Sequence, residues 1–162
     1  MQQTQALLKE SNLEKEKRIK YKGTARIGLE WLYFREKDLD ITHVQELQSL
    51  FRKDCRRLDA RNHVPAIIDQ HHLDSALRVS EIREDVLFMN SQHNIPELIF
   101  WSGYQLECLH GRHRIQAAKQ VLSPSNKWWT VDLYLAGMTN LTFSTPSDRT
   151  ARHQYRIENN SG

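Results

Sequence analysis

The sequence predicts a mixed α/β (α+β) domain in which helices flank one small sheet. Three observations predict it: an amphipathic helical stripe over 43–56, an apolar run over 64–69 that is typical of a buried strand, and a strand-like alternation over 128–136. A further strand passes directly into a helix over 107–122. Since helical and strand segments are interspersed along the body of the chain, we expect them to share a single core.

The first helix is justified by its start and by its apolar face. Thr42 and Gln45 have the spacing of a capping box, and apolar residues between Val44 and Phe51 recur on one side of a helix. We therefore expect a helix over 43–56, followed by the strand "VPAIID".

The middle of the body is predicted to hold two short helical stretches and a hairpin. The helical stretches centre on residues 73–77 and 82–87. The segments 97–101 ("ELIFW") and 104–109 ("YQLECL") flank the pair Ser102-Gly103, where the glycine is available for a positive φ. We therefore expect these two segments to pair as neighbouring antiparallel strands.

Composition predicts a polar N-terminal arm (1–22), one domain (23–137) and a polar, poorly ordered tail (138–162). The chain is 39% hydrophobic and 27% charged, and its net charge of +3 does not by itself indicate a nucleic-acid partner. It has two cysteines, too few for a secreted disulfide framework, and no apolar run near the ~20 residues of a membrane span. We expect an intracellular protein of the cytoplasm or nucleus, with no membrane partner.

The segment "ECLHGRHRIQAAK" concentrates positive charge where the strand becomes a helix. The first turn of a helix presents unpaired N–H groups and the positive end of the dipole, and Gly111 lets an anion approach the backbone. Arg112 and Arg114 add guanidinium forks that match phosphate oxygens, with His110 and His113 as further donors. This pattern predicts a phosphate-binding turn.

The same residues have two alternative interpretations. The arginines have a purely structural use if they pair with acidic side chains such as Glu107, Asp69 or Asp132, and spacing alone leaves that alternative open. A zinc site would need the chain's two cysteines together with the two histidines of this segment. These residues lack the usual spacing of zinc ligands, so no metal site is predicted.

The ordered segments also carry a resemblance to a known fold. The arrangement strand-Gly-x-His-Arg-x-x-Ala-Ala-helix, here "LECLHGRHRIQAAKQVL", resembles the signature of the ParB/sulfiredoxin-like domain. "FREKDLDITHVQELQSLF", "HVPAIID" and "WTVDLYL" are similar to other parts of that fold, so the resemblance covers roughly residues 30–136. "CRRLDARNHVPAIID" and "WWTVDLYLA" resemble, more closely still, a fungal family of large uncharacterised proteins that carry this core near the N-terminus.

The resemblance implies a site and its ligands. It implies a phosphate cradle of Gly111, Arg112, His113 and Arg114, with Arg35 as a second nucleotide contact. The implied ligand is a nucleoside triphosphate such as CTP or ATP, with Mg²⁺ as a candidate companion ion and DNA as a candidate partner. The oligomeric state is left open.

Departures from the fold's pattern limit which catalytic roles the resemblance implies for this chain. Sulfiredoxins have their catalytic cysteine after the glycine, where this chain has Arg112, and Cys108 is expected to be a small buried hydrophobe on the strand. Kinase-like and nuclease-annotated relatives have an aspartate before the glycine, where this chain has His110. Catalytic residues are therefore left unassigned.

Three functional hypotheses remain, and the sequence favours the first. The first is a ParB-like nucleotide-binding module that acts with DNA. The second is a metal-dependent nuclease or phosphotransferase, with His110, His113, Glu30 and Asp69 as candidate acids or bases. The third is a truncated, non-catalytic relative with an interaction role.

Overall fold

A computed structural model describes residues 12, 14–89 and 94–137. The chain divides into two compact units, and the larger one spans Tyr21–Ala136. In the smaller unit, residues 14–20 are helical. The predicted tail and most of the predicted arm lie outside the described residues.

The larger unit is built on one five-stranded mixed sheet of order β1-β5-β3-β4-β2. Two neighbouring pairs, β1 with β5 and β3 with β4, are antiparallel, whereas β3 with β5 and β2 with β4 are parallel. The strands are β1 (Tyr21–Gly28), β2 (Leu32–Tyr33), β3 (Val64–Ile68), β4 (Leu106–Cys108) and β5 (Trp128–Leu135).

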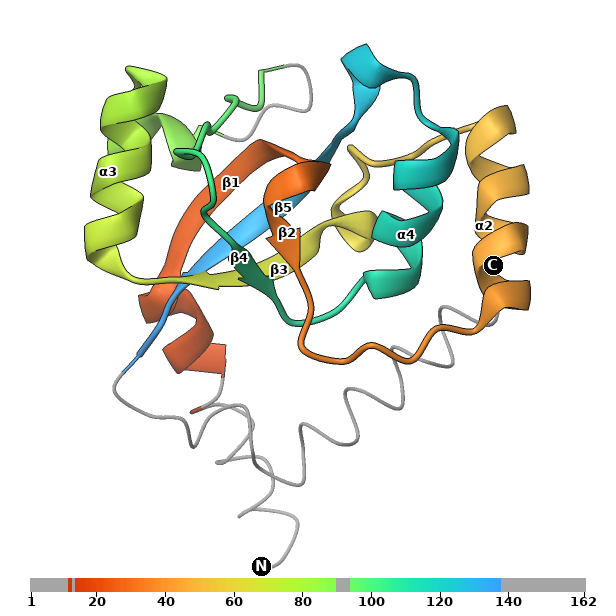
Figure 1. The fold of residues 1–162 in the computed structure, drawn as a ribbon. Coiled ribbons are helices and arrows are strands. Elements are labelled where there is room, and N and C mark those ends of the chain that lie inside the picture. The colour runs from red at the N-terminus through yellow and green to blue at the C-terminus, as the bar shows by residue number, and fades with distance from the viewer. Residues whose placement is uncertain (1–11, 13, 90–93, 138–162) are drawn as a thin grey trace, which may run out of the picture. The chain divides into compact units, whose positions relative to one another are not determined.

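Helices lie beside both ends of the strands, which confirms the predicted fold class. Figure 1 shows α3 near one end of the strands and α4 near the other, with α2 packed against α4. The α-helices in the described part of the larger unit are α2 (Ile41–Lys53), α3 (Gln70–Ser80) and α4 (Arg112–Val121). The short 3₁₀-helices in the same described residues are η1 (Leu29–Trp31), η2 (Ala60–Asn62), η3 (Glu84–Phe88) and η4 (Pro124–Asn126). None of the helices in the described ranges is long and apolar enough to cross a membrane.

The core fixes α4 from two sides. One cluster joins alternate strand residues to Ile115 and Ala118 of α4. A second, smaller cluster joins Val44 and Leu47 of α2 to Ala117. Because apolar contacts hold both faces of α4, the start of this helix is fixed relative to the sheet and to α2. The strand residues of the first cluster include Ala25, Ile27, Val64, Ala66, Ile68, Val131 and Leu133.

The predicted hairpin around Gly103 is wrong. The segment before this glycine bonds to the edge of β1: the Arg26 N–H donates to the Pro96 carbonyl (2.8 Å), and the Leu98 N–H donates to the Arg26 carbonyl (3.0 Å). The segment after it leads to β4, which pairs with β2 and β3. Gly103 does adopt a positive φ of 84°. The turn is therefore confirmed, but the segments on either side of it pair with strands that lie far away in the sequence.

The predicted start of the first helix also needs correction. The N-cap of α2 is Asp40, whose carboxylate accepts a hydrogen bond from the His43 N–H (3.2 Å), so the capping box at Thr42 is wrong. The helix begins two residues earlier than predicted and ends at Lys53. The stretch predicted as helical over 82–87 corresponds to the 3₁₀-helix η3.

A chain of polar contacts joins β1, β5 and His63, the residue directly before β3. The Thr24 hydroxyl donates to Asp132 Oδ1 (2.6 Å) and accepts from the Tyr21 hydroxyl (2.5 Å). The ring nitrogen Nδ1 of His63 lies 3.0 Å from the same Asp132 oxygen. Burial of the imidazole alone would lower the pKa of His63, but the hydrogen bond and the charge of Asp132 outweigh burial and raise the pKa above its ordinary value.

We expect His63 to make stability depend on pH. Because the folded state binds this proton more tightly, its contribution is fully present below the ordinary histidine pKa of about 6.5 and is lost as pH rises through the higher folded pKa. Urea unfolding at several pH values should therefore show a loss of stability that His63→Gln removes. His71→Gln, which changes an exposed histidine on α3, is the control. Equal pH dependence in wild type and His63→Gln would contradict the assignment.

Candidate functional site

The predicted phosphate turn connects β4 to α4 (Figure 1). Gly111 immediately precedes the helix with a φ of 95°, in the left-handed region that strains residues with a Cβ. A Cβ at this position would also lie 2.7 Å from Val64 Cγ2 of β3. The Leu109 N–H donates to the Pro65 carbonyl (2.9 Å), which holds the turn against β3. Glycine is therefore required here both by backbone conformation and by space.

The start of α4 differs electrostatically from the starts of α2 and α3. Asp40 and Asp69 cap those two helices with their carboxylates, whereas Gly111 offers no side-chain cap. The first turn of α4 has no acidic residue and contains Arg112 and Arg114. Cations at the positive end of a helix dipole are unfavourable by about 0.3–1 kcal/mol each, and an anion is favourable there. This end of α4 is therefore complementary to an anion.

Arg112 keeps donors without hydrogen-bond partners at this end of the helix. Only 18% of its side chain is exposed, and Nη1 lies 3.7 Å from Glu36 Oε2, beyond hydrogen-bonding distance. Among the described residues, its Nε and Nη1 are buried and have no hydrogen-bond acceptor. Because unpaired buried donors cost free energy, an acceptor that reached them would be stabilising.

Arg35 lies close to the turn, but an internal carboxylate engages it. Arg35 Nε is 2.5 Å from Glu107 Oε1, and Arg35 Nη2 donates to Glu107 Oε2 (3.3 Å). The neighbouring Glu36 approaches Arg112. Two consecutive residues of the loop before α2 therefore contact β4 and α4, which places this loop along the turn.

His113 joins the first turn of α4 to the start of α2. Its Nε2 accepts a hydrogen bond from the Asp40 N–H (3.1 Å), so the proton of the neutral ring resides on Nδ1. Its ring packs edge-on against the buried His43, with centroids 5.2 Å apart. In this arrangement Nε2 of His113 is an acceptor, and only Nδ1 can act as the predicted donor to an anion.

His110 and Arg114 complete the set of residues predicted at the turn. Both side chains are half-buried, and both have polar interactions within the structure. The predicted residues are thus brought together around the β4–α4 turn, with Arg35 beside them on the loop before α2.

Comparison with known proteins gives a family. Residues 20–156 match the N-terminal domain of a family described as a protein of unknown function, DUF3723. The chain belongs to the DUF3723 family. No curated protein and no solved structure matches the chain. The match includes the whole larger unit of this DUF3723 domain.

The acidic partners that the sequence suggested for the arginines have other contacts. Asp69 of the DUF3723 domain caps α3, Asp132 bonds to Thr24 and His63, and Glu107 pairs with Arg35. The carboxylate that approaches Arg112 is Glu36, which sequence reasoning missed. The available signal was its position in the short charged stretch directly after Arg35.

Cys108 is confirmed as a buried residue of the core. It is 4% exposed, and burial raises the pKa of its thiol to about 12, so the thiol is protonated at neutral pH. Within the described part of the DUF3723 domain, no three His, Cys, Asp or Glu side chains gather as ligands for a metal ion.

Proposed function

We propose that the DUF3723 N-terminal domain binds a nucleoside phosphate at the β4–α4 turn. The observation that carries this proposal is the start of α4, where Gly111 provides no side-chain cap and two buried guanidinium nitrogens of Arg112 have no hydrogen-bond acceptor among the described residues. A phosphate offers several acceptor oxygens to the helix N–H groups and to an arginine fork at once.

Glu36 is a weak internal competitor for this role. Its side chain is 77% exposed, and its carboxylate reaches Arg112 only at 3.7 Å. Because this contact is longer than a hydrogen bond, a phosphate with charge-assisted hydrogen bonds to Arg112 can replace it. We therefore expect the loop around Glu36 to adjust when the ligand binds.

The nucleotide class rests on the resemblance to the ParB/sulfiredoxin-like domain. That resemblance implies CTP or ATP as the ligand, with Mg²⁺ as a companion of the phosphates. Arg35 lies beside the turn, where it can contact a second part of the nucleotide after exchanging its Glu107 contact. The nuclease, phosphotransferase and non-catalytic alternatives stay predictions that no observation here favours.

Thermal unfolding with added ligands tests the proposal. Inorganic phosphate, pyrophosphate, CTP, ATP and GTP, each with and without Mg²⁺, separate recognition of the phosphates from recognition of the base. A ligand at about 100 times its dissociation constant should stabilise the domain by about 2.7 kcal/mol. We expect Arg112→Gln to abolish the shift and Arg112→Lys to weaken it, because lysine keeps the charge but loses the fork.

The control is Arg83→Gln, which removes an exposed arginine paired with Asp85 away from the turn. It should leave the shift unchanged. No stabilisation by any of the five ligands, or an equal shift in wild type and Arg112→Gln, would rule out phosphate binding at this turn.

A further inference from the structure

The end of α2 and the connection from it to β3 carry a basic surface separate from the β4–α4 turn. Residues 52–61, here called the basic loop, hold five basic and two acidic side chains, a net charge of +3. The whole chain also has a net charge of +3, so all other residues sum to zero. The basic residues are Arg52, Lys53, Arg56, Arg57 and Arg61.

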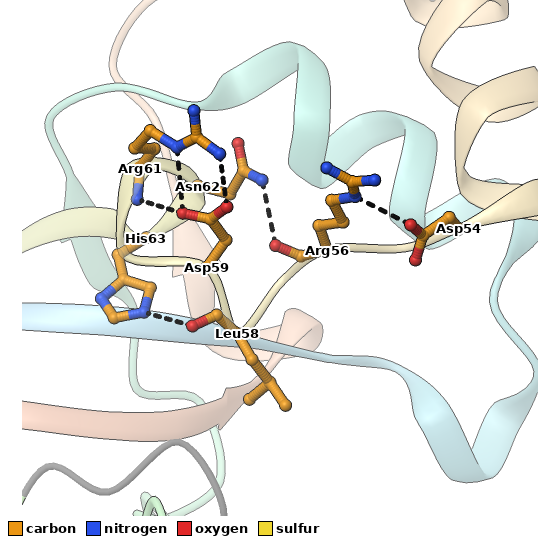
Figure 2. Close-up of polar contacts among 7 residues, drawn as sticks. All are labelled: Asp54, Arg56, Leu58, Asp59, Arg61, Asn62 and His63. Atoms are coloured by element: carbon orange, nitrogen blue, oxygen red, sulfur yellow. Dashed lines mark hydrogen bonds and ion pairs between the residues drawn. The ribbon is translucent and has the colours of Figure 1, made fainter.

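Hydrogen bonds within the basic loop and to its neighbours fix its backbone (Figure 2). Asp59 caps the 3₁₀-helix η2 by accepting from the Arg61 N–H (3.1 Å), and the Asn62 side-chain amide donates to the Arg56 carbonyl (3.0 Å). The Trp129 indole N–H donates to the Asn62 carbonyl (2.8 Å), which anchors the end of the loop to β5. The loop is therefore preorganised, and binding would cost little ordering entropy.

Two arginines of the basic loop are held by aspartates and still extend into solvent. Arg56 Nε donates to Asp54 (2.8 Å), and Arg61 donates to Asp59 through Nε (3.2 Å) and Nη2 (2.8 Å). Their side chains remain 66% and 82% exposed. Figure 2 shows both guanidinium groups on the same side of the loop, with the amide of Asn62 between them. Each keeps N–H donors that face away from its aspartate.

Arg57 has a different role, because it fastens the basic loop to β5. Its guanidinium carbon lies 3.4 Å from the ring centroid of Trp128, and Nη1 donates to the carbonyls of Asn126 (2.6 Å) and Trp128 (3.2 Å). The Arg26 guanidinium also lies over the Trp128 ring, at 4.8 Å. Since arginines already occupy this aromatic ring, the surface offers charge instead of a platform for base stacking.

We propose that the basic loop binds the phosphate backbone of a double-stranded nucleic acid. Duplex DNA carries about one negative charge per 1.7 Å of its axis, and cations that neutralise its phosphates release condensed counterions. Arg56 and Arg61 keep guanidinium N–H donors that suit phosphate oxygens, and the exposed Arg52 and Lys53 add charge beside them. Such contacts position a duplex without reading its sequence. This inference does not depend on the nucleotide site.

Fluorescence anisotropy with a labelled duplex at several NaCl concentrations tests this inference. The logarithm of the association constant should fall linearly with the logarithm of salt concentration for the full chain. We expect Arg56→Gln and Arg61→Gln each to reduce the magnitude of that slope by about 1. The matched control is Arg83→Gln, because Arg83 is 80% exposed and also pairs with an aspartate two residues away, but lies outside the basic loop.

Three further measurements give the outcomes that would overturn the inference. Arg83→Gln should leave the salt-dependence slope unchanged. An equal decrease of the slope in this variant would mean that duplex binding depends on total charge and not on the basic loop. The chain should bind polyglutamate of matched charge more weakly than the duplex. If it binds both equally, and Arg56→Gln weakens both to the same extent, the partner is an acidic protein. Arg112→Gln should leave duplex binding intact; if it alone abolishes binding, the α4 turn holds the nucleic acid and the basic loop does not.

Discussion

Gly111→Ala should destabilise the domain by about 2–5 kcal/mol, because it combines two separate penalties. A residue with a Cβ in the left-handed region costs about 1–2 kcal/mol, and Gly111 has a φ of 95°. The new Cβ would lie 2.7 Å from Val64 Cγ2, and Val64 is fully buried, so neither group can move freely. Overpacking of this kind typically costs about 1–3 kcal/mol. Urea unfolding monitored by tryptophan fluorescence measures the sum.

Two further variants separate the penalties. Gly103→Ala places a Cβ at a φ of 84° with no heavy atom of the described residues within 4 Å, so it should show only the backbone cost. Val64→Ala makes room beside Gly111, and the double variant should be less destabilised than the sum of the two single variants. Additive behaviour, or equal losses for Gly111→Ala and Gly103→Ala, would show that the contact with Val64 contributes nothing.

Local patterns were enough to predict the elements that surround the turn. The alternation of Val131 and Leu133 and the short apolar run from Val64 to Ile68 predicted β5 and β3. The glycine before the stripe of Ile115 and Ala118 predicted the start of α4. In each case the residues that define the element lie within a few positions of one another.

Elements defined by distant partners escaped prediction. The strand β1 alternates Ala25 and Ile27 with the polar Thr24 and Arg26, and its place in the sheet depends on pairing with β5 about a hundred residues later. Thr24 is a polar residue that is only 1% exposed, and its burial is possible because its hydroxyl donates a hydrogen bond to Asp132 on the paired strand. The hairpin prediction is wrong for the same reason, since the residues of a turn do not determine which strands pair.

The candidate site likewise has one part that the sequence predicted and one part that it did not. The contiguous residues of the turn, Gly111 to Arg114, could be found from their spacing and charge. The other side of the site consists of Glu36 and Asp40, which precede the turn by about seventy residues and contact Arg112 and His113. Only tertiary packing of α2 against α4 brings these two segments together, so no local pattern could have predicted their contacts.

Trp129→Ala should destabilise the domain by about 3–5 kcal/mol, the usual cost of removing a large buried aromatic residue. Trp129 is 1% exposed, and the centroid of its ring lies 5.3 Å from that of Phe51 on α2. Its indole N–H donates a hydrogen bond to the Asn62 carbonyl. It therefore joins β5, α2 and the end of the basic loop. Urea unfolding measures the loss.

Trp129→Phe divides this loss into packing and hydrogen bonding. Phenylalanine keeps most of the apolar contact with Phe51 but leaves the Asn62 carbonyl without its indole donor, so the expected cost is smaller, about 1–3 kcal/mol from the lost hydrogen bond. Because that bond anchors the basic loop, Trp129→Phe should also weaken duplex binding although no charge changes. Equal destabilisation by the two substitutions would place the whole effect in the hydrogen bond, and unchanged duplex binding would mean that the loop keeps its shape without this anchor.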